Sequence, residues 1–285
     1  MMSQKEQLLS DLRRIAENRY DLYSGESVSQ YVDKMLQNIG DTDPELRDDL
    51  IYNTFCEWIC EKEYFSGQDL RHILGILMDE NHLFYKIGND GDETVFTRTF
   101  SILVMVLIIS QHRGKHFLDY NGLIQVKNAI IKYYGEEKDF RGYIDEYGWA
   151  HGAAHGADAL DELVQCEESN EEIFREILDS MKKVLYNEKY LLCNEEDERM
   201  ARVVYRMVKR NSLAYRTINH WIDGLNQCCA WERTRKQYVA RVNTKNFVRC
   251  LYFKLVHNQV APDIRNTLLN IEGSLNRFLQ VDKDI

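Results

Sequence analysis

Proline and glycine are scarce in this sequence. Its 285 residues include 2 prolines and 15 glycines, so few positions interrupt a helix or force a turn. This scarcity argues against a turn-rich β protein and favours long helices. Intrinsic disorder is disfavoured as well, because 17 Tyr, 11 Phe and 4 Trp supply the material for a packed core.

Signals for export or membrane insertion are also missing. Residues 1–7 lack the basic-then-apolar pattern of a signal peptide, and neither end carries a lipidation motif. The longest purely apolar run, Ile102–Ile109, is far shorter than the roughly 20 residues that a membrane-spanning helix needs. We therefore expect a cytoplasmic protein without a membrane partner.

Signatures of well-known catalytic sites are absent. The 7 cysteines form neither a disulfide framework nor a CxxC motif, and we interpret them as small buried hydrophobes in a reducing compartment. There is no GxSxG elbow, Walker loop or kinase motif set. The loop Gly88–Asp92 resembles part of a calcium loop, but Phe100 stands where the twelfth-position glutamate belongs.

Apolar residues at helical spacing dominate what remains. Thr94–His112 is apolar on nearly every face, and its length favours a buried central helix over a strand. The other expected helices cover Gln4–Asn18, a segment from Ser27 or Ser29 to Gly40, segments starting at Asp43-Pro44 and near Ser66, Asn121–Tyr134, Trp149–Cys166, Glu171–Tyr186, Glu195–Lys209, Ala214–Arg235, Thr244–Val256 and Pro262–Leu279.

About a dozen helices without βαβ alternation predict an all-α fold. We expect a curved array of antiparallel helical hairpins, an α-α superhelix of the HEAT or armadillo kind, although the sequence has no strict repeat period. The alternative is an irregular helical bundle. No linker divides the chain, so we expect a single domain over residues 1–285.

Positive charge is concentrated in one stretch of an acidic chain. The net charge is −10, yet residues 199–254 hold 13 Lys or Arg against 2 Asp or Glu, interleaved with aromatic residues. This stretch either binds an external anion or docks on the acidic part of its own chain. Nucleic acid is disfavoured as a partner, because no zinc finger, RNA-recognition signature or phosphate loop accompanies the cations.

The segment Gly148–Asp158 is the strongest site candidate. In a helix over Trp149–Cys166, small and aliphatic residues share one face, while His151, His155, Asp158 and Glu162 share the opposite face. Glycines at 152 and 156 weaken such a helix, so we expect a neighbouring backbone or a ligand to approach them closely.

Three interpretations of this polar face stay open. His151, His155 and Asp158 can supply nitrogen and oxygen ligands to one divalent metal ion and activate a bound water, although the HExxH glutamate is missing. The same residues can line a pocket without metal. They can also simply hydrogen-bond to a neighbouring helix or meet water.

Polar residues just before this segment add possible ligand contacts. Arg141 can clamp an anionic group in a bidentate manner. Trp149 can form an aromatic wall, although an anchor in the core is the commoner role of such a residue.

These residues carry a resemblance to a known family. The segments 139–143, 148–151 and 154–158, together with the outer motifs 95–101 and 246–253, resemble the bacterial family called domain of unknown function 2785 from about Val95 to Leu255. The resemblance implies one shared site in an all-helical fold, but no established activity. The residues on which it centres are Arg98, Asp139, Arg141, Gly142, Trp149, His151, His155 and Asp158.

We therefore expect a helical-repeat-like module that binds an unknown small ligand or protein partner. Its predicted ligand contacts are Arg98, Asp139, Arg141, Trp149, His151, His155 and Asp158. The alternative is a metal-dependent hydrolase-like enzyme with a divalent ion on His151, His155 and Asp158 and with Arg98 or Arg141 orienting an anionic substrate. The sequence identifies no catalytic base, so whether the protein is an enzyme stays open.

Overall fold

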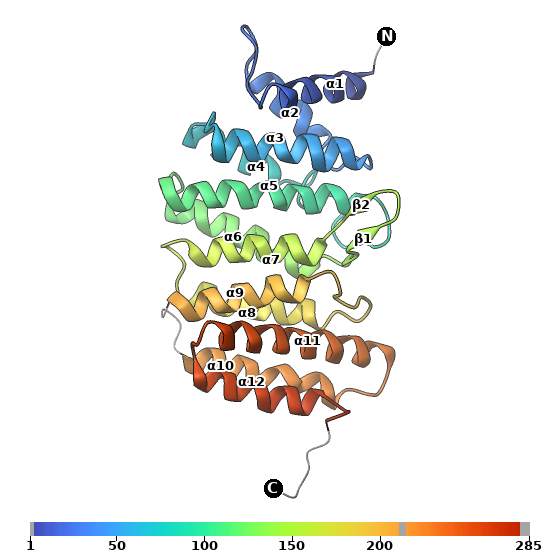
Figure 1. Cartoon of the computed structure of the whole chain (residues 1–285), viewed down its shortest axis with the longest axis vertical. Helices are drawn as coiled ribbons and strands as arrows, with labels where there is room; N and C mark the ends of the chain where they lie inside the picture. The colour runs from blue at the N-terminus through green and yellow to red at the C-terminus, as the bar shows by residue number, and fades with distance from the viewer. Residues whose placement is uncertain (1–2, 211–214, 280–285) are drawn as a thin grey trace, which may run out of the picture. The chain divides into compact units, whose positions relative to one another are not determined.

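The structure is a computed structural model that describes residues 3–210 and 215–279 (Figure 1). The chain forms two compact units, Met1–Glu168 and Ser169–Ile285, which we describe separately. In the described residues, regular structure consists of the helices α1–α12, short π-helical and 3-10 segments, and one two-stranded sheet. The predicted all-α fold class is thus confirmed, whereas the single domain stays a prediction.

Side-chain capping sets the starts of two early helices of unit 1, whereas the helix between them has no side-chain cap. Helix α1 covers Gln4–Glu17, α2 covers Ser29–Gln37 and α4 covers Gly67–Leu77. Ser3 and Ser66 each form a capping box with the acidic residue three positions later, which satisfies free N–H groups of the first turn. Between α2 and α4, π-helical turns flank the short helix α3 (Asn53–Cys56).

Helix α5 (Thr94–Lys115) is the central helix of unit 1, as predicted. It packs against α4 and α7, and side chains around its whole circumference are buried. An 18-residue window of this helix has a mean hydropathy of 1.6, so the helix is long and apolar enough to cross a membrane. However, 72% of that window is buried inside the structure. Its apolar composition is accounted for by its position in the core of the unit.

The last part of unit 1 carries the predicted site. Helix α6 covers Tyr120–Glu136, and the strands β1 (Tyr143–Ile144) and β2 (Gly148–Trp149) form an antiparallel hairpin that leads into α7 (Gly152–Gln165). The prediction that this helix begins at Trp149 is wrong. Trp149 pairs with Tyr143 in the hairpin, and His151 has a left-handed φ of 54°, which a right-handed helix cannot contain, so α7 begins only at Gly152.

Unit 2 is built from α8 (Glu171–Leu185), α9 (Glu196–Arg210), α10 (Tyr215–Asp223), a 3-10 segment (Gly224–Ala230), α11 (Arg235–His257) and α12 (Pro262–Leu275). Helix α11 packs between α9 and α12 (Figure 1). The predicted helix Ala214–Arg235 is instead divided between α10 and the 3-10 segment, and its first residue lies outside the described residues.

The predicted start of a helix at Thr244 is also wrong. Thr234 caps α11, and Thr244 lies inside this helix, where its hydroxyl donates to the Ala240 carbonyl at 2.7 Å. Asn243 is likewise buried, and its side-chain oxygen accepts a hydrogen bond from the backbone N–H of Leu192. Polar residues that resemble a helix start in the sequence therefore serve as buried contacts within unit 2.

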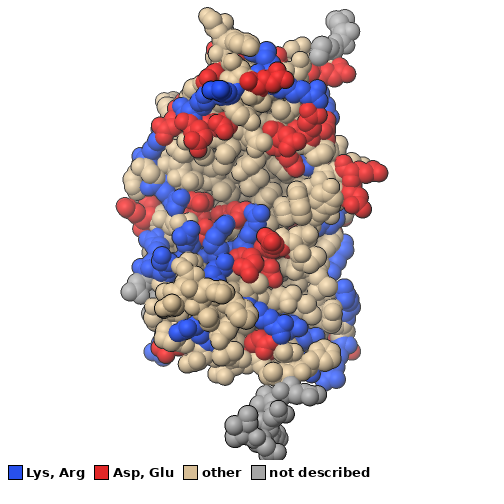
Figure 2. Space-filling view, viewed as in Figure 1, with Lys and Arg blue, Asp and Glu red and all other residues tan. Residues whose placement is uncertain are grey.

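Several cations of the 199–254 stretch pair with carboxylates of unit 2 itself. Lys236 pairs with Glu188, Lys254 Nζ lies 3.1 Å from Glu198, and Arg249 contacts Glu272 on α12. Basic and acidic side chains are interspersed over the face drawn in Figure 2. For these three cations, the partner is the acidic surface of their own unit rather than an external anion.

Candidate functional site

The β1–β2 hairpin presents an aromatic surface next to the start of α7. Trp149 is 42% exposed and Tyr143 is 56% exposed, and their rings meet edge to face with centroids 5.0 Å apart. Trp149 also stacks on the imidazole of His151, with ring centroids 4.2 Å apart and an interplanar angle of 4°. The Trp149 ring therefore lies at the surface and is not packed in the core.

His151 is held in an uncommon backbone conformation. It has φ 54° and ψ 36°, the left-handed region that non-glycine residues rarely adopt, and it immediately precedes α7. Its side chain is buried, and its ring centroid lies 5.4 Å from that of His155. Backbone strain of this kind gathers at sites where the surrounding structure fixes one geometry.

His155 lies one turn further along α7, and its tautomer is fixed by α5. Its Nδ1 is 3.2 Å from the Thr99 carbonyl oxygen, which can only accept a hydrogen bond, so Nδ1 carries the proton. In the neutral ring the lone pair is then at Nε2. Trp149, His151 and His155 thus form a continuous series of rings from the surface inward, and Asp158 is buried on the next turn of the helix.

The two glycines of α7 permit the close approach that was predicted. A Cβ atom at Gly152 would lie 2.6 Å from the backbone oxygen of Asp139, and one at Gly156 would lie 2.4 Å from the ring of Tyr134. The hydroxyl of Tyr134 also donates to the Ala153 carbonyl at 3.0 Å. What approaches the glycines is therefore the polar segment before the hairpin and an aromatic ring of α6.

Arg98 forms a fully buried ion pair with Glu137. Its Nε and Nη2 lie 2.6 and 2.9 Å from the two carboxylate oxygens, and both side chains have no solvent exposure. Its Nη1 donates to the Tyr85 carbonyl and to the Thr94 hydroxyl. The guanidinium thereby connects the loop before α5 to the end of α6. Its contact with a ligand stays a prediction.

Asp139 and Arg141 connect the same loop to the hairpin. The carboxylate of Asp139 is fully buried and accepts from the Gly91 N–H at 2.9 Å and from the Arg141 guanidinium. A further Arg141 nitrogen donates to the Asp92 carbonyl at 2.6 Å. The structure brings Asp139 and Arg141 together, with Asp139 facing protein groups; their binding of a ligand stays a prediction.

A second histidine pair was missed by the sequence reasoning. Within the described residues, the ligand atoms of His112, His116 and Glu168 lie within 4.8 Å of one another, which makes them a possible His/Glu site in unit 1. His112 and His116 have the same four-residue spacing as His151 and His155, and this repeated HxxxH pattern is the signal that was available. For His151, His155 and Asp158, metal binding stays a prediction.

Hydrogen bonding at His112 disfavours a metal ion in this trio. The backbone N–H of Leu118 donates to His112 Nδ1 at 3.1 Å, so the lone pair is at Nδ1 and the proton of the neutral ring is at Nε2. Nε2 faces the Glu168 carboxylate at 3.3 Å. A metal ion needs a lone pair at Nε2, and this tautomer does not offer one.

Unit 1 should lose stability in mild acid because of His112. Burial lowers the pKa of His112 from its ordinary value of 6.5, although nearby Glu168 acts in the opposite direction. The unfolded chain therefore takes up the proton first, so this contribution is complete above about pH 6.5 and declines as pH falls further. Urea denaturation at several pH values measures it.

The substitution His112→Asn should flatten that pH dependence, because the amide oxygen can still accept from the Leu118 N–H but does not titrate. His72→Asn is the matched control, since His72 is exposed on α4. An unchanged pH profile in His112→Asn would assign the acid sensitivity to other groups.

Comparison with known proteins gives one family. No curated protein and no solved structure matches the chain. Residues 83–253, more than half of the chain, match the family described as protein of unknown function, DUF2785. The match spans helix α5, the hairpin and α7, and it agrees with the resemblance seen in the sequence. This chain is therefore a member of the DUF2785 family.

Proposed function

We propose that this DUF2785 member is a binding module that uses the surface of Trp149, His151 and His155 to hold a small ligand or a segment of a protein partner. The observation that carries the proposal is the stack of an exposed tryptophan on a buried histidine in a left-handed backbone conformation. A large aromatic ring at the surface and polar groups behind it are the usual composition of a binding site.

The geometry favours a ligand with a planar group. One face of Trp149 is covered by His151 and its ring meets Tyr143 at a steep angle, yet 42% of the residue stays exposed. Stacking on such a ring contributes on the order of 1–3 kcal/mol when a nucleic-acid base is the partner. A planar heteroaromatic or amide group is therefore the part of a ligand that we expect to lie there.

The substitution Trp149→Ala should weaken binding by about tenfold or more, as lost stacking of this size predicts. Ligands are first sought by thermal-shift screening of heteroaromatic metabolites and short aromatic peptides, and affinities are then measured by calorimetry. Trp231→Ala is the matched control, because Trp231 is 38% exposed and also meets a tyrosine edge to face, but lies in unit 2. An equal loss of affinity in both variants would show that the ligand does not bind at the hairpin.

The alternative function, a metal-dependent hydrolase-like enzyme, keeps one specific observation in its favour. The His155 tautomer places the lone pair at Nε2, as in histidines that bind metals through Nε2 while the other nitrogen donates to a carbonyl. Zinc titration of the wild-type protein and of His151→Ala/His155→Ala tests this alternative. Equal, negligible uptake by both would reject it.

We also propose that the helices continue the pattern of antiparallel hairpins as a HEAT-like array, in a cytoplasmic protein without nucleic-acid or membrane partners. Packing of the consecutive helices α6 and α7 in unit 1 and of α11 and α12 in unit 2 supports the hairpin pattern inside each unit. Small-angle X-ray scattering distinguishes a curved array from a compact bundle.

A further inference from the structure

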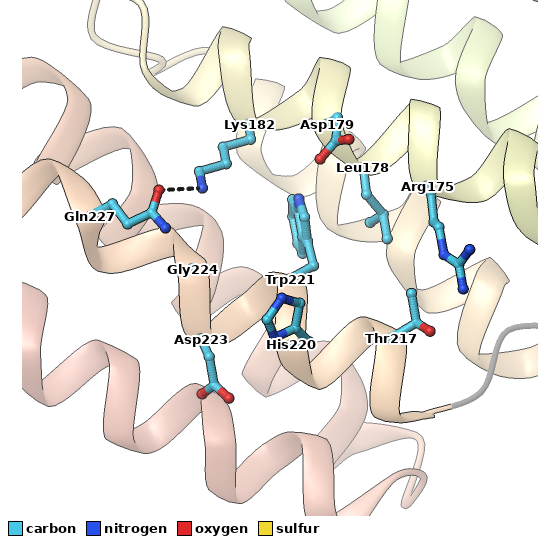
Figure 3. A pocket seen from close by; sticks show the side chains of 10 residues that line it. All are labelled: Arg175, Leu178, Asp179, Lys182, Thr217, His220, Trp221, Asp223, Gly224 and Gln227. Carbon is cyan, nitrogen blue, oxygen red and sulfur yellow. Dashed lines mark hydrogen bonds between the residues drawn. The ribbon is translucent and has the colours of Figure 1, made fainter.

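Unit 2 contains a cavity of about 490 Å³ between α8, α10 and the 3-10 segment Gly224–Ala230 (Figure 3). A volume of this size is typical of small-molecule sites. Most of the lining residues carry polar groups, and they include Lys182 and Asp179 on α8, Thr217, His220 and Trp221 on α10, and Gln227 on the 3-10 segment. None of these residues belongs to the site in unit 1.

The indole of Trp221 carries an unused hydrogen-bond donor in this cavity. Trp221 is 7% exposed and packs edge to face on Phe247, yet its Nε1 has no hydrogen-bond partner among the described residues. Figure 3 shows this nitrogen directed toward α8, between Lys182 and Asp179. An unsatisfied buried donor is costly, so a bound water or an acceptor atom of a ligand is expected at this place.

Lys182 adds a positive charge beside this donor. Its ammonium group donates to Gln227 at 2.9 Å and is partly desolvated, which lowers its pKa. A Cβ atom at Gly224 would lie 3.4 Å from Lys182 Nζ, so the glycine leaves room for the lysine head group. An indole N–H and an ammonium group are both donors of the kind that bind a carboxylate.

A negative charge lies one helical turn away from Lys182. Asp179 is three residues earlier on the same face of α8, and its carboxylate has no hydrogen bond or ion pair within the part of the chain that the structure describes. Arg175, the other cation of the cavity, is already paired with Glu171. The lining therefore offers the Lys182 ammonium group beside two carboxylates, those of Asp179 and Asp223, and Asp179 attracts Lys182 across one turn of α8.

We propose that this cavity binds a free α-amino acid. Its carboxylate accepts from Lys182 Nζ and Trp221 Nε1, and its ammonium group faces Asp179. In an α-amino acid the two charged groups are joined through a single carbon, which matches charges that lie one turn apart on α8. The remaining volume, next to Leu178, Thr217 and His220, accommodates the side chain of the ligand.

Calorimetry of the full chain with each of the common amino acids tests the proposal. We expect at least one to bind, and we expect its N-acetyl and its amide derivatives to bind at least tenfold more weakly, because each lacks one of the two charges. Absence of binding by all free amino acids at millimolar concentration would overturn the proposal and leave the cavity filled by water only. Equal binding of a free amino acid and its N-acetyl derivative would overturn it as well.

Variants then locate the binding. Trp221→Phe, Lys182→Met and Asp179→Asn should each weaken it by about tenfold, the effect of losing one hydrogen bond or charge contact. Lys183→Met is the matched control, because Lys183 is exposed on the same helix outside the cavity. Asp179 is also exposed, so Asp179→Asn tests the site even if the Trp221 variant fails to fold. Unchanged affinity in Lys182→Met and Asp179→Asn would place the ligand elsewhere.

Discussion

Replacing Glu137 by glutamine should lower the free energy of unfolding of unit 1 by about 3–5 kcal/mol. The substitution leaves the Arg98 guanidinium buried without its counter-charge, because the two side chains pair with no solvent exposure. Glu137 Oε1 also accepts hydrogen bonds from the backbone N–H groups of Lys138 and Asp139, and a glutamine oxygen can still accept them, so the expected loss comes from the unpaired charge. Amide hydrogen exchange in α5, α6 and α7 measures the loss within this unit.

Glu45→Gln is the matched control for this result. Glu45 forms an ion pair with Arg13 of similar geometry, but their side chains are 44% and 51% exposed. Solvent screens an exposed pair, which therefore contributes little to stability, so this variant should be nearly as stable as the wild type. If Glu137→Gln lowered the free energy of unfolding no more than Glu45→Gln does, the buried Arg98 pair would contribute no more to stability than an exposed pair. Arg98→Met combined with Glu137→Gln should cost less than the sum of the single changes, since it leaves no unpaired charge.

Gly156→Ala should destabilise unit 1 by about 1–3 kcal/mol, even though alanine is the better helix former. The added methyl group would lie 2.4 Å from the ring of Tyr134, which is itself buried and hydrogen-bonded to α7. Neither the ring nor the helix can move apart without losing that packing. Urea denaturation followed by circular dichroism measures the change.

The same substitution at Gly75 should have the opposite sign. Gly75 is exposed inside α4, and a Cβ atom there meets nothing within 4 Å, so Gly75→Ala should raise the free energy of unfolding by up to about 1 kcal/mol. In a Tyr134→Ala background the cost of Gly156→Ala should largely disappear. A stabilising effect of Gly156→Ala in the wild-type protein would contradict the tight contact between α6 and α7.

Much of the helical fold was predictable, because helix formation depends on local features. Apolar spacing and length correctly identified α5 as a buried helix, and the helix expected from near Ser66 is α4. The glycines of α7 correctly indicated a close approach, since the preference of a helix for alanine over glycine is also local. The site segment and the family resemblance were likewise visible in the residues themselves.

The prediction was wrong at positions where local sequence is compatible with more than one backbone structure. Trp149 continues the apolar pattern of a helix, but its backbone pairs with Tyr143 in the hairpin. Thr244 resembles a helix start, but it lies in the interior of α11. In both cases, contacts with more distant parts of the chain decide the outcome, and propensity alone does not contain them.

The sequence by itself determined the all-helical class, the central helix α5 and the concentration of histidines and carboxylates near α7. Only the tertiary structure decided the partners of the buried polar groups. Arg98 meets Glu137 at a separation of 39 residues, and His112 meets Glu168 across the packed helices of unit 1. The physical reason is that periodicity fixes which face of a helix is buried, whereas packing in three dimensions determines which charges and donors meet on that face.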